Sequence, residues 1–227
     1  MNIVECKDLS KIYEDQSQKV VALNSVSLSI VPGEFVSFVG PSGSGKTTLL
    51  NLIGALDSPT SGSIILDGVD LSTLSNREQS DLRLRSIGFV FQAYNLIPVL
   101  SARENVEFVM HLQGIRADER RTRAKEVLIS VGLEGLFDRR PGELSGGQQQ
   151  RVAVARAIVS KPKLVLADEP TANLDSTTAQ NLIGLMRSLN EKFGITFIFS
   201  THDPIVMGFA RRVVKLRDGA IEEEVRA

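Results

Sequence analysis

The sequence has almost no cysteine, no tryptophan and no long hydrophobic run. Cys6 is the single cysteine among 227 residues, so no internal disulfide can form, and we expect a reducing compartment. No apolar segment approaches the ~18 residues that a membrane-spanning helix needs. Charged residues begin at Glu5 and Lys7, which is too early for a secretory signal peptide. If this protein works at a membrane, we expect another chain to supply the membrane spans.

A strong charge of either sign is absent too. The 26 Lys and Arg residues nearly balance the 27 Asp and Glu residues, so the composition predicts no nucleic-acid partner. The mixed-sign run over 118–126 could form a basic patch, but pairs such as Glu119 with Arg123 favour a solvated helix face. With 42% hydrophobic and 23% charged residues, the chain is neither disordered nor collagen-like, and its length suits one large domain.

Strand patterns alternate with helical patterns along most of the chain. Apolar alternation or short apolar runs predict strands over 25–30, 34–39, 63–66, 87–91, 163–168, 195–200 and 211–216. Apolar residues spaced as on one helix face predict helices over 49–56, 124–131 and 182–189. From about 93 to 145 no strand pattern appears, while Ser101 and Glu104 form a capping box that begins a helix. The alternation predicts an α/β fold whose largely parallel sheet is covered on both faces, with a helical insertion.

A glycine-rich loop lies between the predicted strand 34–39 and the next predicted helix. It matches the pattern G-x-x-x-x-G-K-[ST] with Gly40, Pro41, Ser42, Gly43, Ser44, Gly45, Lys46 and Thr47. Glycines let backbone N–H groups converge on an anion, and the following helix adds the positive end of its dipole. We expect Lys46 to reach the β- and γ-phosphates of a nucleotide and Thr47 to ligate Mg²⁺. A chance glycine turn is the alternative, and the position between strand and helix argues against it.

Two acidic residues, Asp168 and Glu169, stand where the apolar run of 164–167 ends. A Mg-nucleotide site needs a carboxylate for the metal and a group that orients the attacking water. Because neighbouring strand residues point to opposite sides, we assign Asp168 to Mg²⁺, through water, and Glu169 to the general base. Acids are also common where a helix or turn follows a strand, and the nearby phosphate loop is what favours the functional interpretation.

Two further segments suggest ligand contacts. His202 follows the predicted strand 195–200, and ligands bind at such strand ends in open α/β sheets, although a lone histidine is more often a surface residue. Ser145 and Gln148 form a capping box around Gly146 and Gly147, and a capped helix start of this kind is also a good anion site. Since the chain already has one phosphate cradle, the second one suggests an anion that arrives on another molecule.

These motifs, in this order, resemble those of the nucleotide-binding subunits of ABC transporters over roughly residues 2–223. The phosphate loop, the signature Leu144–Gln148, the acidic pair Asp168–Glu169 and His202 carry the resemblance. It implies a P-loop NTPase core with a mainly parallel sheet, an N-terminal antiparallel β-subdomain and a helical subdomain. A single ATP-binding domain would cover 1–227, with the core at about 1–92 and 146–227 and the helical subdomain at about 93–145.

The resemblance also implies ATP and Mg²⁺ as ligands and assigns further residues to them. Gln92 would sense Mg²⁺ and face the membrane partner, and Asp175 would belong to a loop that crosses a dimer interface. Tyr13 would lie under the adenine, because any base can stack on an aromatic face, although it could be an ordinary strand-end tyrosine. Thr48 would extend the phosphate loop, and His202 would contact the γ-phosphate and support catalysis by Glu169 and Lys46.

By the same resemblance, two copies would join head to tail around two ATP molecules. Ser145 and Gly147 of one copy would cap the γ-phosphate that Lys46 of the other copy holds, around one two-fold axis. Hydrolysis would remove the phosphate that holds this homodimer closed, so that nucleotide chemistry drives opening and closing.

The segment Tyr94–Val106 resembles, more narrowly, the ATPases of the lipoprotein-release and macrolide-export type. In that branch the permease has few spans and a large extracytoplasmic domain, so this chain would work at the cytoplasmic face of the inner membrane. A cell-division ATPase that signals to a membrane partner, rather than transporting, is the alternative. A small-molecule kinase would have the phosphate loop without Ser145–Gln148.

Overall fold

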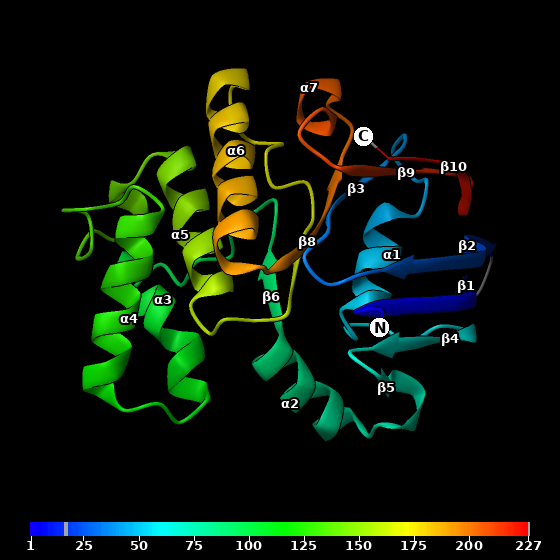
Figure 1. Ribbon diagram of the computed structural model, residues 1–227, viewed down its shortest axis with the longest axis horizontal. Helices are drawn as coiled ribbons and strands as arrows, with labels where there is room; N and C mark the ends of the chain where they lie inside the picture. The colour runs from blue at the N-terminus through cyan, green and yellow to red at the C-terminus, as the bar shows by residue number, and fades with distance from the viewer. Residues whose placement is uncertain (16–17, 227) are drawn as a thin grey trace.

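The computed structural model describes residues 1–15 and 18–226, which form two sheets and the helices around them (Figure 1). The first sheet is antiparallel, with the strand order β2-β1-β4-β5. Its strands are β1 Val4–Asp15, β2 Gln18–Ile30, β4 Ser61–Leu66 and β5 Val69–Asp70. The expected N-terminal antiparallel layer is therefore present.

The second sheet has the strand order β10-β9-β3-β8-β7-β6. Its strands are β3 Phe35–Val39, β6 Ile87–Val90, β7 Leu164–Ala167, β8 Thr196–Thr201, β9 Arg212–Arg217 and β10 Ala220–Arg226. All neighbouring strands pair in parallel except β9 with β10. β3, β7 and β8 are buried along their whole length, which explains their unbroken apolar runs. The predicted α/β fold is confirmed.

Helices cover both faces of the parallel sheet. α1 (Lys46–Ile53) packs on one face in a core that includes Val36 and Phe38. On the other face, α5 (Gly146–Ile158) and α6 (Ser176–Phe193) pack in a second core with Phe35 and Phe199, whose ring centroids lie 5.0 Å apart. Phe35 and Val36 belong to different cores because neighbouring strand residues point to opposite faces.

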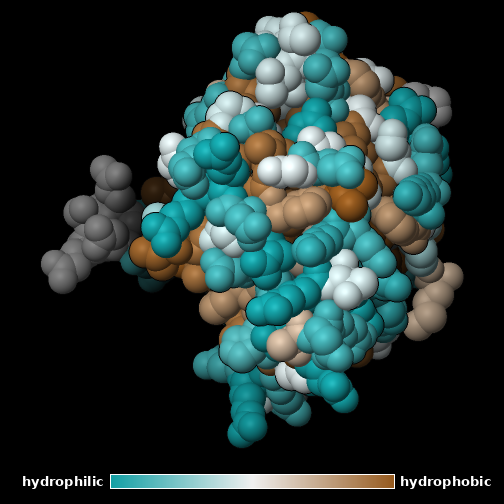
Figure 2. Space-filling model, turned by 90° about the vertical axis from the view of Figure 1, so that its left-hand side faces the viewer, coloured by the Kyte–Doolittle hydropathy of each residue, from teal (hydrophilic) through white to brown (hydrophobic). Residues whose placement is uncertain are grey.

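α3 (Ala102–Leu112) and α4 (Ala117–Ser130) lie together beside the parallel sheet, and α5 packs against both (Figure 1). The predicted capping box of Ser101 and Glu104 begins α3, and Arg123 pairs with Glu119 on α4 as predicted. Figure 2 shows the side of the molecule that α3 and α4 form, and its surface is mostly hydrophilic with small hydrophobic areas. Among the described residues, no helix is long and apolar enough to cross a membrane.

The shorter elements are α2 Asn76–Ser86, α7 Pro204–Met207 and the 3₁₀ turns Leu71–Thr73 and Pro141–Glu143. None of the residues of α2 is buried, so this helix has no apolar stripe, and only the capping box of Ser75 and Glu78 marks its start. The helix predicted over 49–56 ends at Ile53, and Leu56 lies beyond it with 48% of its surface exposed. Including Leu56 in the helical stripe was wrong because the chain turns at Gly54.

Candidate functional site

The phosphate loop connects the end of β3 to the start of α1. Gly45 has φ +99°, and a Cβ there would lie 2.6 Å from the carbonyl oxygen of Ala22, so the position requires glycine. Lys46 is 7% exposed, and its Nζ donates to the carbonyl oxygens of Gly40 at 2.8 Å and Pro41 at 3.0 Å. An ammonium group has three donors, so one N–H remains available to a phosphate in the loop.

Asp168 and Glu169 point to different partners, as predicted, but strand alternation is not the cause. β7 ends at Ala167, and Glu169 lies beyond it with φ +44°, so a left-handed turn separates the two side chains. The Thr47 hydroxyl donates to Oδ1 of Asp168 at 3.1 Å, and the Ser200 hydroxyl donates to the same oxygen at 2.7 Å. The Glu169 backbone N–H donates to the Ser200 hydroxyl at 2.7 Å. Asp168 is thus held beside Thr47, and Glu169 is turned away from it.

The donor set at Thr47 and Asp168 suits Mg²⁺. Mg²⁺ prefers oxygen ligands and usually takes one or two carboxylates together with phosphate oxygens and waters. A hydroxyl and a carboxylate oxygen 3.1 Å apart, next to a phosphate loop, provide that partial set. No group of three or more His, Cys, Asp and Glu side chains that could hold a metal by themselves occurs within residues 1–15 and 18–226. The site therefore fits a metal that arrives with a nucleotide rather than one held by the protein alone.

Glu169, His202 and Lys46, the three predicted catalytic residues, lie close together. The Glu169 carboxylate oxygens are 2.9 and 3.1 Å from Nδ1 of His202 and 4.0 Å from Nζ of Lys46. The Glu169 side chain is 18% exposed, whereas that of His202 is 67% exposed. His202 therefore reaches over the carboxylate from the solvent side, where an incoming phosphate would meet both groups.

A cavity of about 810 Å³ runs from Tyr13 along the phosphate loop to His202. It brings together most of the predicted site residues, and its lining includes Tyr13, Pro41, Ser42, Gly43, Ser44, Gly45, Lys46, Thr47, Thr48, Gln92, Glu169 and His202. Gly40 and Asp168 are not part of the lining, but they contact it through their bonds to Lys46 and Thr47. One cavity thus offers an aromatic ring, an anion cradle and a carboxylate in a row.

The signature residues are not part of this cavity. Ser145 caps α5 by accepting from the backbone N–H of Gln148 at 3.3 Å, so the predicted capping box is confirmed. Ser145 is exposed, and Gly146, Gly147 and Gln148 are absent from the lining. Asp175 is absent as well, and its carboxylate caps α6 by accepting from the backbone N–H of Thr178 at 3.0 Å. Within one chain, Ser145 of the predicted second anion site therefore faces solvent, and Gly146, Gly147 and Gln148 are half-buried.

Two buried residues that the sequence analysis missed support the site. Ser200, at the end of β8, joins Asp168 to the backbone of Glu169. Gln150 on α5 is fully buried, and its Nε2 donates to the carbonyl oxygens of Phe91 at 3.3 Å and Pro170 at 2.8 Å. Ser200 could have been recognised from the sequence, because it ends a predicted parallel strand, where site residues gather. Gln150 could not be recognised in this way, because the only unusual feature is a polar residue one turn before the apolar Val154.

Comparisons with known proteins agree on one family. A family model described as "ABC transporter" matches residues 23–172. The macrolide export ATP-binding/permease protein MacB of Syntrophobacter fumaroxidans is 47% identical over 99% of this chain and 32% of its own length. An uncharacterized ABC transporter ATP-binding protein of Methanocaldococcus jannaschii, MJ0796, is 45% identical over 98% of this chain and 96% of its own.

A solved structure of the archaeal relative supports the same family. A dimeric post-hydrolysis state of MJ0796 bound to ADP and Pi has a TM-score of 0.91 and 44% identity, covering 98% of both chains. This chain therefore spans about a third of the MacB relative and nearly all of the archaeal one.

Proposed function

The chain belongs to the ABC transporter family as an ATP-binding, ATP-hydrolysing cassette, and from this premise we propose which residues do the work and what they drive. The observation that carries the proposal is that Lys46, Thr47 and Glu169 line one cavity with an aromatic side chain at its far end. The matched residues 23–172 include the phosphate loop, the signature and both acids. Relatives named as transporters favour transport over signalling.

ATP binding is assigned to the loop and its surroundings. Lys46 and the backbone N–H groups of 40–47 hold the β- and γ-phosphates, and Tyr13 supports the adenine. Thr47, Asp168 and Gln92 are the residues that would hold Mg²⁺, directly or through water. When bound, Mg²⁺ neutralises charge on the phosphate oxygens.

Hydrolysis is assigned to Glu169 and His202. Glu169 orients the attacking water and accepts its proton, since the carboxylate is held near Lys46 and points into the cavity. His202 lies against that carboxylate through Nδ1, and the exposed edge of its ring contacts the γ-phosphate. Ser200 holds the Asp168 carboxylate and the Glu169 backbone in fixed positions relative to each other, because its hydroxyl is hydrogen-bonded to both.

The complete site needs two copies of the chain. Ser145 and Gly147 lie outside the cavity, and Ser145 at the start of α5 is exposed, so they are free to meet a phosphate held by a second copy. Asp175, exposed at the start of α6, approaches the same interface. A two-fold axis then creates two equal ATP sites, each closed by the partner's signature. The similar archaeal cassette is dimeric with ADP and Pi bound.

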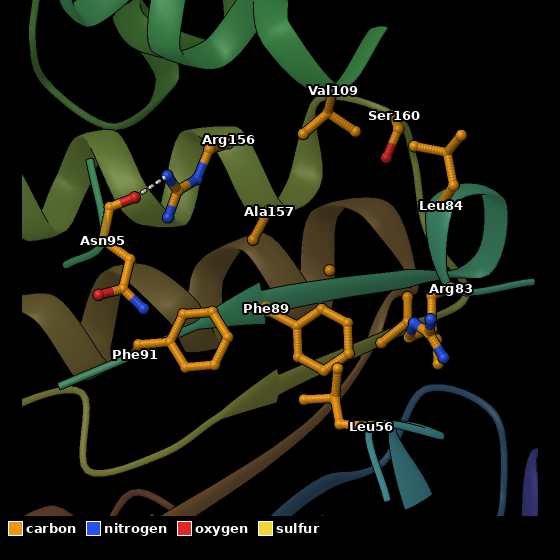
Figure 3. Close-up of a pocket in the computed structure, with 12 residues that line it drawn as sticks. Leu56, Arg83, Leu84, Phe89, Phe91, Asn95, Val109, Arg156, Ala157 and Ser160 are labelled. Carbon is orange, nitrogen blue, oxygen red and sulfur yellow. Dashed lines mark hydrogen bonds between the residues drawn. The ribbon is translucent and has the colours of Figure 1, made fainter. Parts of the chain in front are cut away.

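We divide the chain into a core of about 1–92 and 146–227 and a helical subdomain of about 93–145. A groove of about 290 Å³ is lined mainly by core side chains from α2, β6 and its extension, and α5, and Val109 of α3 and Asn95 contribute from the helical subdomain (Figure 3). Phe89, Phe91 and Leu56 form its apolar floor, while Arg83 and Arg156 stand at its sides. Phe91 of the groove is followed in the chain by Gln92, which lines the nucleotide cavity, so these two residues link the two sites along the backbone.

This groove is the proposed docking site for a cytoplasmic segment of the permease. Its apolar floor suits a short helix with an apolar face, and the two arginines suit an acidic residue on that helix. A shift of the helical subdomain against β6 would change the groove and so move the docked segment. The names of the MacB relatives combine an ATP-binding and a permease function, which supports a membrane permease as the partner. From the narrower resemblance of Tyr94–Val106 we propose that this permease has few spans and a large extracytoplasmic domain. The cassette would then sit at the cytoplasmic face of the cell membrane.

The test is ATP turnover and ATP binding of Lys46→Ala. Loss of the only side-chain cation in the phosphate loop should abolish one or both. Lys125→Ala, which removes an exposed lysine of α4, serves as the matched control and should behave as wild type. Wild-type affinity and turnover in Lys46→Ala would contradict the assignment of the phosphate loop.

A further inference from the structure

Three side chains form a cluster beside the mouth of the nucleotide cavity. The Tyr13 hydroxyl donates to Oδ2 of Asp57 at 2.9 Å. The Lys11 ammonium donates to Oδ1 of Asp57 and to the carbonyl oxygen of Ser58, both at 2.7 Å. The same ammonium lies 4.9 Å from the centre of the Tyr13 ring. Asp57 thus holds the phenol end of the ring, while Lys11 covers the ring itself.

The cluster is firmly anchored. Asp57 follows α1 in a turn, and its Oδ1 also accepts from the backbone N–H of Ser58 at 2.7 Å. Three residues after Asp57, the Thr60 hydroxyl accepts from the backbone N–H of Ile12 at 3.0 Å, which ties the turn to β1. The Lys11 side chain is only 13% exposed, although lysine side chains normally stay in water. A buried ammonium needs such partners, so the lysine is fixed in place.

Only one of these three side chains faces the cavity. Tyr13 lines it, whereas Lys11 and Asp57 do not, and Tyr13 is 43% exposed. The ion pair of Lys11 with Asp57 would be enough to connect β1 to the turn after α1. The hydrogen bond from the Tyr13 hydroxyl and the Lys11 ammonium over the Tyr13 ring do something further, because they fix the orientation of the exposed Tyr13 side chain. With Lys11 on one side of the ring, Tyr13 still lines the cavity and keeps 43% of its surface exposed.

The pKa values agree with this arrangement. Burial raises the pKa of the Tyr13 phenol, and the hydrogen bond to Asp57 and its negative charge raise it further. Burial alone would raise the pKa of Asp57, but the hydrogen bonds from Lys11, Tyr13 and the Ser58 backbone outweigh it and lower that pKa. Asp57 is therefore an ionised acceptor that keeps Tyr13 protonated.

We propose that Lys11 and Asp57 are positioning residues that hold the Tyr13 ring in advance in the orientation that stacks on the nucleotide base. This inference rests on the proposed function, since it takes Tyr13 to lie under the adenine. Ordering a free side chain on binding weakens affinity, so a ring held beforehand binds the base more tightly. Loss of the cluster should weaken ATP binding by about three- to tenfold.

The experiment compares ATP with inorganic tripolyphosphate, which has phosphates but no base. Dissociation constants are measured by calorimetry for wild type, Lys11→Met, Asp57→Asn and Tyr13→Ala. Lys7→Met is the matched control, because it removes an exposed, carboxylate-paired lysine from the same strand. We expect weaker ATP binding in the first three variants, unchanged tripolyphosphate binding in all, and wild-type values for Lys7→Met.

The outcomes separate this inference from the proposed function. If Tyr13→Ala weakens ATP binding but Lys11→Met and Asp57→Asn do not, the positioning role is refuted. Equal losses for ATP and tripolyphosphate would also refute it, because the cluster would then act through the fold or the phosphate loop. If Tyr13→Ala leaves ATP binding unchanged, the assignment of Tyr13 to the base fails first.

A spectroscopic readout tests the hydrogen bond itself. The chain has two tyrosines and no tryptophan, so in Tyr94→Phe the ultraviolet absorbance of ionised phenol reports Tyr13 alone. We expect Tyr13 to titrate above the ordinary pKa of tyrosine, and at lower pH once Asp57→Asn is added. Titration that does not change with Asp57→Asn would contradict the cluster.

Discussion

Replacing Glu169 by Gln tests the proposed catalytic chemistry most sharply. Gln keeps the size of the side chain and can still accept a hydrogen bond from Nδ1 of His202, which lies 2.9 Å from the carboxylate. It cannot accept the proton of the attacking water. We expect Glu169→Gln to bind ATP and to hydrolyse it far more slowly than wild type.

The size of the effect follows from the lost proton acceptor and the lost charge. A positioned general base contributes about 10²- to 10⁴-fold to a rate, so turnover should fall by a factor in that range. Glu169 also lies 4.0 Å from Lys46, where an ion pair has a Coulomb energy of about 4 kcal/mol at an effective dielectric constant of about 20. Removing the carboxylate leaves Lys46 to pair with phosphate instead, so ATP affinity should not decrease.

The assay is phosphate release in a single turnover, together with ATP binding by calorimetry. Glu191→Gln is the matched control, because this exposed glutamate pairs with Arg187 and Arg211 far from the cavity. It should hydrolyse ATP at the wild-type rate. Wild-type turnover in Glu169→Gln would remove Glu169 from the catalytic role, and loss of ATP binding would show that the side chain holds the nucleotide instead.

Three further changes test how neighbouring residues support the site. Ser200→Ala should lower turnover by about fivefold in the ATPase assay, because Asp168 loses one of its donors and a hydrogen bond of about 1 kcal/mol disappears. Gln150→Leu removes the side-chain donor from the Pro170 carbonyl and one of the two donors from the Phe91 carbonyl, and it should lower the free energy of unfolding in urea by about 1–3 kcal/mol. Val99→Asp should spare the ATPase of the isolated chain but uncouple it from the permease, measured by transport in membranes, because Val99 is 72% exposed. Unchanged turnover, unchanged stability or normal coupling, respectively, would contradict these assignments.

The local motifs of the site could be predicted because each depends on residues close together in sequence. A glycine-rich loop with Lys46 binds phosphate by its own backbone geometry, and the Ser101 and Ser145 caps need only the residues of one helical turn. The structure places Lys46, Glu169 and His202 side by side because the strands that precede them, β3, β7 and β8, are neighbours in the sheet. Their strand-end positions were readable from the sequence.

Long-range support could not be predicted in the same way. Gln150 contacts carbonyls 59 and 20 residues away, and Lys11 reaches an aspartate 46 residues away, so no local pattern marks either contact. The left-handed turn at Glu169 replaced the expected strand alternation, because β7 ends two residues earlier. Two apolar residues of the segment 96–99 also differ in burial, since Leu96 packs against the core while Val99 faces solvent. The sequence could not predict which of them is buried, because an irregular segment has no helix or strand periodicity.

The shared site between two copies is the central claim, and the mass of Glu169→Gln in solution tests it most directly. The mass is measured by light scattering after size exclusion, with and without saturating ATP, and again after Ser145→Arg is added. We predict twice the 24.8 kDa chain mass with ATP, and the single-chain mass without ATP. The double variant should bind ATP but stay monomeric, because the arginine fills the space that the partner's γ-phosphate must enter. A single-chain mass for Glu169→Gln at saturating ATP, or a dimer that survives Ser145→Arg, would contradict the claim.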